Sequence, residues 1–491
     1  MGHEAVVVGS TLPLDELPEA PGRGPDRRLS RGPAATRLRG ALADLLGQDA
    51  VLEGDATLPY LHDETRLQGL VGRADAVVAP RDAASVARLV SWCYEEGVAI
   101  IPRGGGTGFA GGAVPIDGGV VCSMERLNRV LTFDPEFWRV HVEAGVTTAR
   151  VQTLARESGL FYPPDPGAGE LSQIGGNVAT NAGGPHSFKY GVTGAWVTGL
   201  DVVIGGGRTL SLGGPLRKDV AGLDLRSLFV GSEGTLGIVT SAWLRLIPAL
   251  EARCTILAGY SDIHDGVAAI LNLMASGTSP ATIEYLDPGS VGAARAAFPG
   301  GMPDEVKFLV LTEVDGPTAA LPGLRTEVKE ALAPGMLTAR VYASRREQEE
   351  IARWRGGVSY AVSAQRGGKM SEDIAVPVDR LEEAINLTLE AASAAGLTGC
   401  SFGHAGDGNL HASFMIDATD TAEVTAAERG METVFAGALK LGGTVSGEHG
   451  LGWVKRHQFA RQFTGPEAEL QLQVKALFDP QGLLNPGKKG L

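Results

Sequence analysis

Hydrophobic and polar positions between residues 34 and 102 follow two spacings in turn, one typical of helices and one typical of strands. The pattern predicts a helix at 34–47, a strand at 74–80, a helix that stops near 97 and a strand at 98–102. Asp82 and Ser85 are alternative N-caps for the second helix, and Gly97 is a suitable end. A helix between two short apolar strands is how an α/β layer arrangement begins.

The pattern changes again further along the chain. From 104 to about 247, glycine-rich turns alternate with short strands such as VTGLDVVIGGG, and Pro248 marks a plausible domain end. Beyond it, strands such as VKFLVLTEVD alternate with helical stretches such as HDGVAAILNLMAS, and no internal repeat is present. Because 491 residues are too many for one compact core, we expect two or three domains.

The composition is that of an ordinary folded protein, with 44% apolar and 20% charged residues. No apolar run reaches the roughly 18–20 residues that a membrane span needs, and the start lacks the basic and apolar order of a signal peptide. The four cysteines lie far apart without a CxxC pair, which favours reduced thiols over disulfides or a cysteine metal site. These features predict a cytoplasmic protein.

The charge balance argues against nucleic acid as a partner. The formal net charge is −14, and the one dense basic run is GRGPDRRLSR, within residues 1–33, which we expect to form a flexible tail. The 69 glycines are clustered rather than spread. Clustered glycine indicates backbone that passes close to a ligand.

The segment PRGGGTGFAGG, residues 102–112, contains a formal GxGxxG at Gly106, Gly108 and Gly111. A Rossmann dinucleotide site needs a helix directly after that motif, but AVPIDGGVVCS follows and Pro115 opposes a helix. The Rossmann interpretation therefore fails. A glycine loop can still bind an anion through consecutive backbone N–H groups, and a wide turn without a ligand is the alternative.

Two further glycine-rich segments favour binding: PPDPGAGELSQIGGNVATNAGG (163–184) and LFVGSEGTLGIVTSAWLRLIP (228–248). Three such loops separated by short strands suggest one extended ligand held by backbone. Together they resemble the FAD-binding domain of the vanillyl-alcohol oxidase/p-cresol methylhydroxylase flavoprotein superfamily. Within it, NAGGPHSFKYGVTG (181–194) resembles the glycolate oxidase FAD subunit and D-lactate dehydrogenase group, and the likeness runs from about residue 50 to FDPQGLLNPGKKG.

The resemblance implies an α+β fold, with a two-part FAD-binding domain of the p-cresol methylhydroxylase type and an α/β cap (substrate) domain containing an antiparallel sheet. It places the tail at 1–33, the FAD-binding domain at 34–248, the cap domain with a metal site at 249–460, and a segment that returns to the FAD-binding domain at 461–491. The first glycine loop contains no histidine, so non-covalent FAD is implied, and His186 receives no covalent role. By position, the implied FAD contacts are Arg103, Gly104, Gly105, Gly106, Thr107 and Gly108 at the pyrophosphate; Pro164, Asp165, Gly175, Gly176, Asn177, Thr180 and Gly183 along the flavin and ribityl chain; Glu233, Gly237, Ile238 and Val239 at the adenosine; and Asn485 near the C-terminus.

A second cluster of chemistry lies in FGHAGDGNLHASF (402–414) and GTVSGEHGLGWVKR (443–456). Three imidazoles and a carboxylate, from a chain with nine histidines, suit Zn²⁺, Mn²⁺ or Fe²⁺. On one straight strand, however, His404 and His411 would face opposite sides, so the Ala-Gly-Asp-Gly between them must form a turn. The residues alone leave a metal site and two structural histidines as equal alternatives.

The resemblance favours the site. In the D-2-hydroxyacid dehydrogenases of this superfamily, the matching motifs imply His404, His411 and Glu448 as ligands of a divalent metal and His449 as catalytic base. They imply Arg355, in IARWRGGVSYAV, as the catalytic residue that grips the substrate carboxylate, with Lys369 and Ser359 also on the substrate. A surface helix arginine is the alternative for Arg355, because Arg353 is an equally near candidate.

The sequence departs from relatives that act on 2-hydroxyglutarate. Where those have a lysine before the VP turn, this chain has Ser371, with Lys369 two residues earlier, and where they have an asparagine it has Ser413. Both departures favour a smaller acid. The implied reaction is FAD-dependent oxidation of a small D-2-hydroxyacid, of the glycolate or D-lactate type, in which the metal and Arg355 hold the substrate, His449 takes the hydroxyl proton and hydride leaves C2 for the flavin N5.

Reduced FAD must pass its electrons on, and the chain has no cysteine cluster or haem motif of its own. The expected acceptor is a partner protein, such as an iron–sulfur subunit, or a quinone, and a partner of this kind is the expected route to any membrane association. The alternatives are a 2-hydroxyglutarate-type dehydrogenase, a non-redox FAD-containing alkyl-transfer synthase, and a flavin electron-carrier subunit without a substrate site. Glu448 argues against the synthase, which resembles this region but carries three histidines there.

Overall fold

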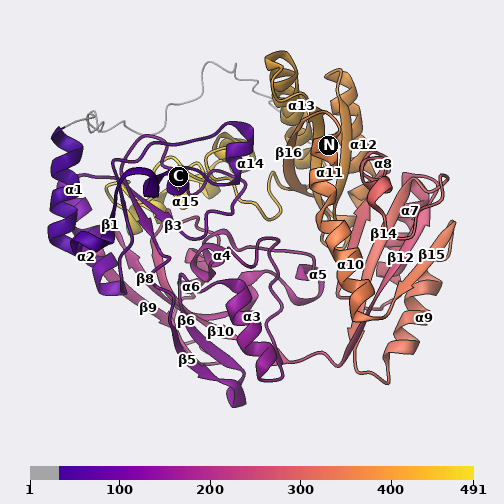
Figure 1. The fold of residues 1–491 in the computed structure, drawn as a ribbon, viewed down its shortest axis with the longest axis horizontal. Coiled ribbons are helices and arrows are strands. Elements are labelled where there is room, and N and C mark those ends of the chain that lie inside the picture. Colours follow the sequence, from indigo (N-terminus) through magenta and orange to yellow (C-terminus); the bar gives the residue numbers. More distant parts are fainter. Residues whose placement is uncertain (1–32) are drawn as a thin grey trace, which may run out of the picture.

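The structure, a computed structural model, describes residues 33–491. Two bodies of secondary structure stand side by side, one formed mainly before Pro248 and the other mainly after it (Figure 1). We call them the N-terminal half and the C-terminal half. Apart from Pro33, the tail predicted at 1–33 lies outside the described residues.

The first sheet of the N-terminal half has four strands in the order β1-β2-β4-β3, of which β2, β4 and β3 run parallel. Its elements are α1 (Pro33–Leu46), β1 (Val51–Leu52), β2 (Ala76–Val78), α2 (Ala83–Glu96), β3 (Ile100–Arg103) and β4 (Val120–Ser123). The helix-between-strands prediction is confirmed. Asp82, rather than Ser85, caps α2 by accepting a hydrogen bond from the Ser85 backbone at 2.7 Å, and Gly97 ends the helix with φ 67°.

The second sheet of this half is antiparallel, in the order β5-β6-β10-β8-β9, and a small pair β11-β7 lies apart from it. The strands are β5 (Val130–Asp134), β6 (Arg139–Glu143), β7 (Leu160–Phe161), β8 (Val197–Ile204), β9 (Arg208–Gly213), β10 (Ile238–Arg245) and β11 (Ile247–Pro248). The helices are α3 (Thr148–Glu157), α4 (Ile174–Thr180), α5 (Ser187–Tyr190) and α6 (Arg226–Phe229). One hydrophobic core joins both sheets.

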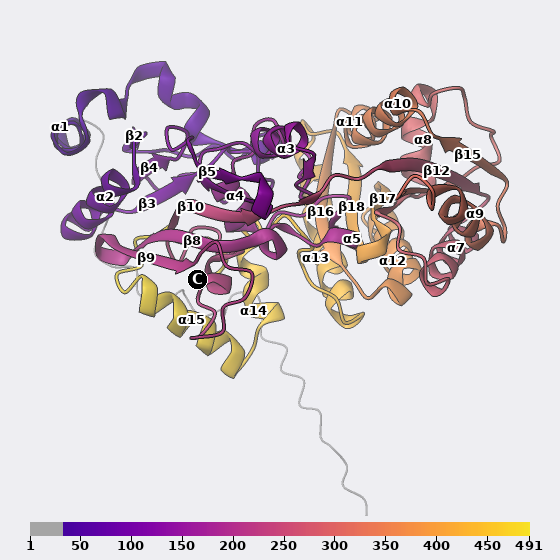
Figure 2. The same cartoon turned by 90° about the horizontal axis from the view of Figure 1, so that it is seen from below.

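The C-terminal half is built on a seven-stranded antiparallel sheet in the order β15-β12-β14-β13-β17-β18-β16. Its strands are β12 (Ala252–Tyr260), β13 (Thr282–Leu286), β14 (Phe308–Gly316), β15 (Thr338–Tyr342), β16 (Gly368–Ala375), β17 (Thr398–His404) and β18 (Asn409–Ile416). Helices cover both faces (Figure 2). One face carries α8 (Pro288–Ala294), α10 (Arg345–Gly356) and α11 (Val358–Ala364), and the other carries α7 (Ile263–Ala275), α9 (Leu321–Leu332), α12 (Leu381–Ala394) and α13 (Thr421–Lys440).

After α13 the chain crosses back to the N-terminal half through α14 (Phe459–Gln462) and α15 (Pro466–Phe478), so the C-terminus lies among the first strands (Figure 1). Leu484 forms a parallel bridge with Ile100 of β3. The buried ammonium of Lys488 donates to the carbonyls of Gly111 and Val114 at 2.8 and 2.6 Å. The glycine loop predicted to bind phosphate is therefore held in place by the end of the chain.

Candidate functional site

The turn required between His404 and His411 is present. Strand β17 ends at His404, a single 3-10 turn covers Ala405–Asp407, and β18 begins at Asn409. Gly408 closes the hairpin in the left-handed region at φ 67°, where a Cβ would stand 1.9 Å from the Val376 carbonyl oxygen. As a result the two imidazole rings lie 5.6 Å apart between centroids and share one space.

Strand register explains why the chemistry gathers on one face of the sheet. Glu284 of β13 pairs with His404, while both Phe402 of β17 and Asp373 of β16 pair with His411. Directly paired residues, and residues two apart along a strand, project from the same face of an antiparallel sheet. The face that carries these side chains is the one covered by α10 and α11.

Glu448 completes the predicted ligand set from the loop after α13. One ligand atom from each of His404, His411 and Glu448 lies within 4.8 Å of the others, which is a geometry that can hold a metal ion. The Glu448 Oε1 atom stands 3.5 Å from His404 Nε2 and 3.6 Å from His411 Nε2. Two imidazoles and one carboxylate suit Zn²⁺, Mn²⁺ or Fe²⁺.

The charges in the cluster also fit a cation. Burial opposes the ionisation of Glu448, yet the neighbouring histidines, first of all His404, lower its pKa to about 2. Burial likewise opposes protonation of His404, but the carboxylates of Glu284 and Glu448 raise its pKa well above the usual value. Burial lowers the pKa of His411 to about 3. Without a metal, these shifts favour a protonated His404 between the carboxylates of Glu284 and Glu448. A divalent cation bound by His404 would take the place of that proton.

Glu284 links the candidate metal ligands to the predicted substrate arginine. Its buried carboxylate accepts from His404 Nδ1 at 2.5 Å and from Arg355 Nη2 at 2.6 Å. The bond to Nδ1 leaves His404 Nε2 to face the cluster, which is the usual arrangement behind a metal-ligating histidine. The structure places Arg355 here and leaves Arg353 exposed, and the buried Nε of Arg355 has no hydrogen-bond partner among the described residues.

Lys369 and Ser359 lie on the same side of the sheet as Arg355. The Lys369 ammonium donates to the Ser359 hydroxyl at 2.6 Å, and no carboxylate within the described part of the chain pairs with it. Burial lowers the pKa of Lys369 to about 8. The Lys369 ammonium and the Arg355 guanidinium each lie 5.4 Å from the centroid of the Phe402 ring, and Phe402 in turn contacts His411. Two cationic side chains thus lie near the candidate metal ligands, both beside Phe402.

His449 stands on the other side of the cluster. Its Nε2 lies 3.7 Å from Glu448 Oε1, and its ring stacks on His411 with centroids 5.4 Å apart. Phe109, from the first glycine loop of the N-terminal half, contacts the same ring at 5.1 Å. The predicted base therefore lies where the two halves meet.

The first glycine loop has the backbone expected of an anion site. None of the amides of residues 104–112 donates a hydrogen bond to another described residue. A Cβ on Gly105 would stand 2.1 Å from the Leu171 carbonyl oxygen, so the loop passes directly over the second glycine-rich segment. Arg103 packs against the loop, since a Cβ on Gly106 would stand 2.0 Å from its guanidinium, and it donates to the carbonyls of Pro59 and His62, both at 2.7 Å.

The other two glycine-rich segments border both the loop and the candidate metal ligands. A Cβ on Gly104 would lie 3.3 Å from Gly176, and one on Gly183 would lie 3.1 Å from the Glu448 carboxylate. The Glu233 carboxylate accepts from the backbones of Leu451 and Gly452 at 3.0 and 2.7 Å. The predicted cofactor segments therefore surround the loop that carries Glu448 and His449.

Asn485 sits at the centre of this junction. Its Nδ2 donates to the carbonyls of Gly112 and Glu233 at 2.9 and 2.8 Å, while its buried Oδ1 has no partner among the described residues. The buried Oε1 of Gln173, beside the first glycine loop, is also unpaired there. Unpaired buried acceptors and free amides fit FAD, whose phosphates accept and whose ring systems also donate hydrogen bonds.

The sequence interpretation missed three residues beside this site. They are Glu284; Asp373, which accepts from the amides of Glu448 and His449; and Lys455, whose ammonium donates to Asp373. Each is almost fully buried. A charged residue at a core-facing strand position, such as Glu284 in TIEYL or Asp373 in SEDIA, was the available signal. The sequence did not show which residues these carboxylates contact, because their strand partners lie far away along the chain.

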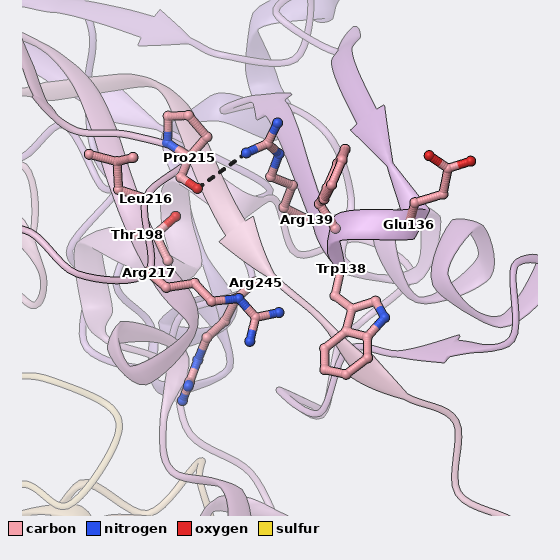
Figure 3. Close-up of a pocket in the computed structure, with 9 residues that line it drawn as sticks. Glu136, Trp138, Arg139, Thr198, Pro215, Leu216, Arg217 and Arg245 are labelled. Carbon is pink, nitrogen blue, oxygen red and sulfur yellow. Dashed lines mark hydrogen bonds between the residues drawn. The ribbon is translucent and has the colours of Figure 1, made fainter.

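A surface pocket of about 380 Å³ lies in the N-terminal half, near the turn between β5 and β6 (Figure 3). Arg139, Arg217 and Arg245 line it, and Arg139 donates to the Pro215 carbonyl at 3.4 Å. Glu136 is its only acid, and it has no histidine. None of the residues of the candidate site lines this pocket.

Solved structures define the class of the fold. A structure of p-cresol methylhydroxylase with substrate bound has a TM-score of 0.74 at 18% identity, covering 93% of this chain and 96% of that one. An alkyldihydroxyacetonephosphate synthase has a TM-score of 0.71 at 20% identity, covering 93% and 85%. At such identities the likeness concerns the fold alone, and it confirms the α+β expectation.

Sequence relatives define the family. Residues 74–213 match the family described as "FAD binding domain", and residues 249–489 match "FAD linked oxidases, C-terminal domain". The glycolate oxidase subunit GlcD of Bacillus subtilis is 37% identical over 84% of this chain and 88% of its own length. The D-lactate dehydrogenase of Anaerostipes hadrus is 32% identical over 89% and 94%. The chain therefore belongs to the FAD-linked oxidases and is an FAD-linked oxidoreductase whose cofactor is FAD.

Another relative is the D-2-hydroxyglutarate dehydrogenase of Stutzerimonas stutzeri, 32% identical over 84% of this chain and 90% of that one.

None of the helices in residues 33–491 has the length and apolar character needed to cross a membrane. The domain boundaries and the individual site residues remain predictions.

Proposed function

We propose that the protein oxidises a small D-2-hydroxyacid, of the glycolate or D-lactate type, to the 2-oxoacid. The observation that carries this proposal is the convergence of His404, His411 and Glu448 with Arg355 and His449 where the two halves meet. A 2-hydroxyacid offers a carboxylate, a hydroxyl and a C–H bond on adjacent atoms. The cluster offers a guanidinium, a metal site and an imidazole for them.

In this proposal, Arg355 binds the substrate carboxylate with the edge of its guanidinium that Glu284 does not occupy. Glu284 holds the guanidinium in place, so binding costs little side-chain entropy. His449 Nε2 accepts the hydroxyl proton, and Phe109 shields that ring from one side. These residues orient C2 toward the cofactor segments around Gly183.

The ligands His404, His411 and Glu448 would hold the metal, whose contribution is to acidify the bound hydroxyl. Bound FAD supplies the two-electron acceptor. Because the glycolate oxidase relative is named as a subunit, we propose a partner protein, such as an iron–sulfur subunit, or a quinone as the next electron acceptor. Neither an alkyl-transfer synthase nor a pure electron carrier would need this set of ligands, base and arginine.

One observation favours a second candidate, a longer acid with a distal negative charge, as in 2-hydroxyglutarate. Lys369 is a buried cation without a carboxylate partner among the described residues. Against this candidate, Ser371 and Ser413 stand where the 2-hydroxyglutarate dehydrogenases have a lysine and an asparagine, and the two serines are hydrogen-bonded to each other at 2.7 Å. A distal carboxylate would pair with Lys369. In that case the KM for the diacid should rise above about pH 8, where Lys369 loses its charge, while the KM for D-lactate should not.

The experiment is an anaerobic titration of the yellow protein with glycolate and with the D- and L-forms of lactate, malate and 2-hydroxyglutarate. Bleaching of the flavin by glycolate or D-lactate, with metal present in the same sample, is the expected result. Bleaching by L-isomers, by diacids alone, or by none of these acids would contradict the proposal.

A further inference from the structure

Asp373 is a fully buried carboxylate on β16 that holds the loop after α13 by its backbone. Its Oδ2 atom accepts hydrogen bonds from three consecutive amides, those of Gly447, Glu448 and His449, at 2.6, 2.7 and 3.2 Å. These residues include a proposed metal ligand and the proposed base. The Asp373 side chain therefore fixes the backbone position of both Glu448 and His449.

The other oxygen of Asp373 lies near the imidazole of the proposed base. Oδ1 accepts from the Lys455 ammonium at 2.5 Å and lies 3.3 Å from His449 Nδ1. Lys455 is also buried, and it donates further to the carbonyls of Asp373 and Val445. Ser446 contributes its hydroxyl to the same carboxylate at 3.2 and 3.3 Å.

The partners of Asp373 determine what His449 must present to it. Backbone N–H groups and an ammonium can only donate, so the carboxylate that receives them acts as an acceptor at both oxygens. A ring nitrogen that faces such an oxygen is stabilised when it carries hydrogen and repelled when it presents a lone pair. Asp373 Oδ1 lies closer to Nδ1, at 3.3 Å, than Glu448 Oε1 lies to Nε2, at 3.7 Å, and a metal held by Glu448 would draw that second oxygen away, so the contact with Asp373 favours hydrogen at Nδ1.

We propose that Asp373 is a positioning residue that fixes His449 in the Nδ1–H tautomer, so that Nε2 is the atom that accepts the substrate proton. The inference rests on the proposed role of His449 as base. When the hydroxyl O–H bond breaks, its proton forms the new N–H bond at Nε2, and the positive imidazolium that results lies against the Asp373 carboxylate. Lys455 offsets the negative charge of Asp373 while the base is neutral.

The decisive variant is Asp373→Asn. The three amides require an oxygen, so the new NH₂ group faces His449 Nδ1 and donates to it, which forces the proton to Nε2. We expect kcat to fall by about 10³-fold, within the range for a base held in the wrong tautomer or removed, and KM to change less than about threefold. FAD and metal content should stay at the wild-type level, because no proposed ligand is altered.

Two further variants control this test. Ser446→Ala removes a hydrogen bond to the same carboxylate without touching the imidazole, and we expect its kcat to stay within about threefold of wild type. The double variant Asp373→Asn/Lys455→Met removes the contact between the new NH₂ and the ammonium, should the single variant fold poorly. It should show the same loss of kcat.

The tautomer can be read directly in the zinc-loaded wild-type holoenzyme by ¹⁵N NMR of labelled histidine, with His449→Gln to assign the signals. Protonated Nδ1 in wild type and protonated Nε2 in Asp373→Asn are the expected results. Nε2–H in wild type, an unchanged kcat in the variant, or a loss that follows FAD or metal content would overturn the inference. If no 2-hydroxyacid reduces the flavin, the proposed function fails, while the NMR result still decides the role of Asp373.

Discussion

The predicted cofactor site and the predicted metal site differ in the groups that form them, since backbone forms the first and side chains form the second. The cofactor segments of the N-terminal half present mainly backbone, with free amides across residues 104–112 and glycines placed where a Cβ would collide with a neighbouring strand or loop. The cluster in the C-terminal half consists of side chains, and buried carboxylates such as Glu284 and Asp373 hold them in place. The first kind of site is sensitive to added volume and the second to lost charge.

The largest expected effect is a loss of turnover without a loss of FAD, caused by a change in the side-chain site alone. His404→Ala removes a proposed metal ligand, and we expect turnover with the active acid to fall by about 10³-fold or more, because metal catalysis contributes several kcal/mol. The protein should remain yellow, since the cofactor segments are untouched. Removing metal from wild type with a chelator should have the same effect, and turnover that survives it would contradict the metal role. His264→Ala, at an exposed histidine on α7, is the control.

The converse change adds one methyl group to the backbone site. In Gly105→Ala the new Cβ would meet the Leu171 carbonyl at 2.1 Å, so the loop must shift, and overpacking of this kind costs about 1–3 kcal/mol. We expect FAD to bind 10- to 100-fold more weakly, as measured by flavin fluorescence on dilution, with zinc content unchanged. Gly112→Ala is matched to it, because no atom of residues 33–491 lies within 4 Å of the added Cβ and φ there is not positive. Equal loss of FAD in both variants would show that the loop does not bind through close approach.

A smaller change tests whether the side-chain site behaves as one unit. Glu284→Gln keeps the size of the group but weakens its bonds to both His404 and Arg355. We expect metal affinity to fall about tenfold, as for other partners of metal-ligating histidines, and the KM for the substrate to rise in the same variant. Glu382→Gln, at an exposed pair with His264, is the control. A change in only one of the two quantities would separate the metal from the arginine.

The smallest effect concerns the join between the halves. His186, in the N-terminal half, lies between Asp165 and Glu313 of β14, with its ring nitrogens 2.5 and 3.1 Å from their oxygens. Burial opposes protonation, but the two carboxylates raise the pKa of His186 to about 10. A raised pKa means that the added stability is complete below about pH 6.5 and is lost as pH rises through about 10.

The thermal unfolding midpoint of wild type should therefore exceed that of His186→Gln by about 2–4 °C at pH 6.5, and the difference should disappear above pH 10. Differential scanning calorimetry of both proteins across this range measures it. A difference that is constant with pH would rule out a charged imidazole at the join.

The sequence was informative where one residue type had a single structural use. Gly97, Gly105 and Gly408 mark a helix end, a close approach and a hairpin turn, and local rules were sufficient to expect glycine loops and a turn between His404 and His411. The choice of Asp82 over Ser85 needed the structure, because both residues can cap a helix. The roles of Glu284 and Asp373 also could not be predicted without the structure. Their partners, at positions 404 and 355 for the first and 447 to 455 for the second, are brought together by sheet register and by the loop after α13.

The return of the chain to its first sheet bears on how the protein is made. Asn485 and Lys488 hold the glycine loop, yet the ribosome adds them long after residues 104–112 have emerged. The early sheet can form during synthesis, but its cofactor loop lacks these contacts until Asn485 and Lys488 have been added. A chain cut short near residue 480 would then be colourless while most of its core was intact, so flavin loading reports that residues 481–488 have been made and have docked.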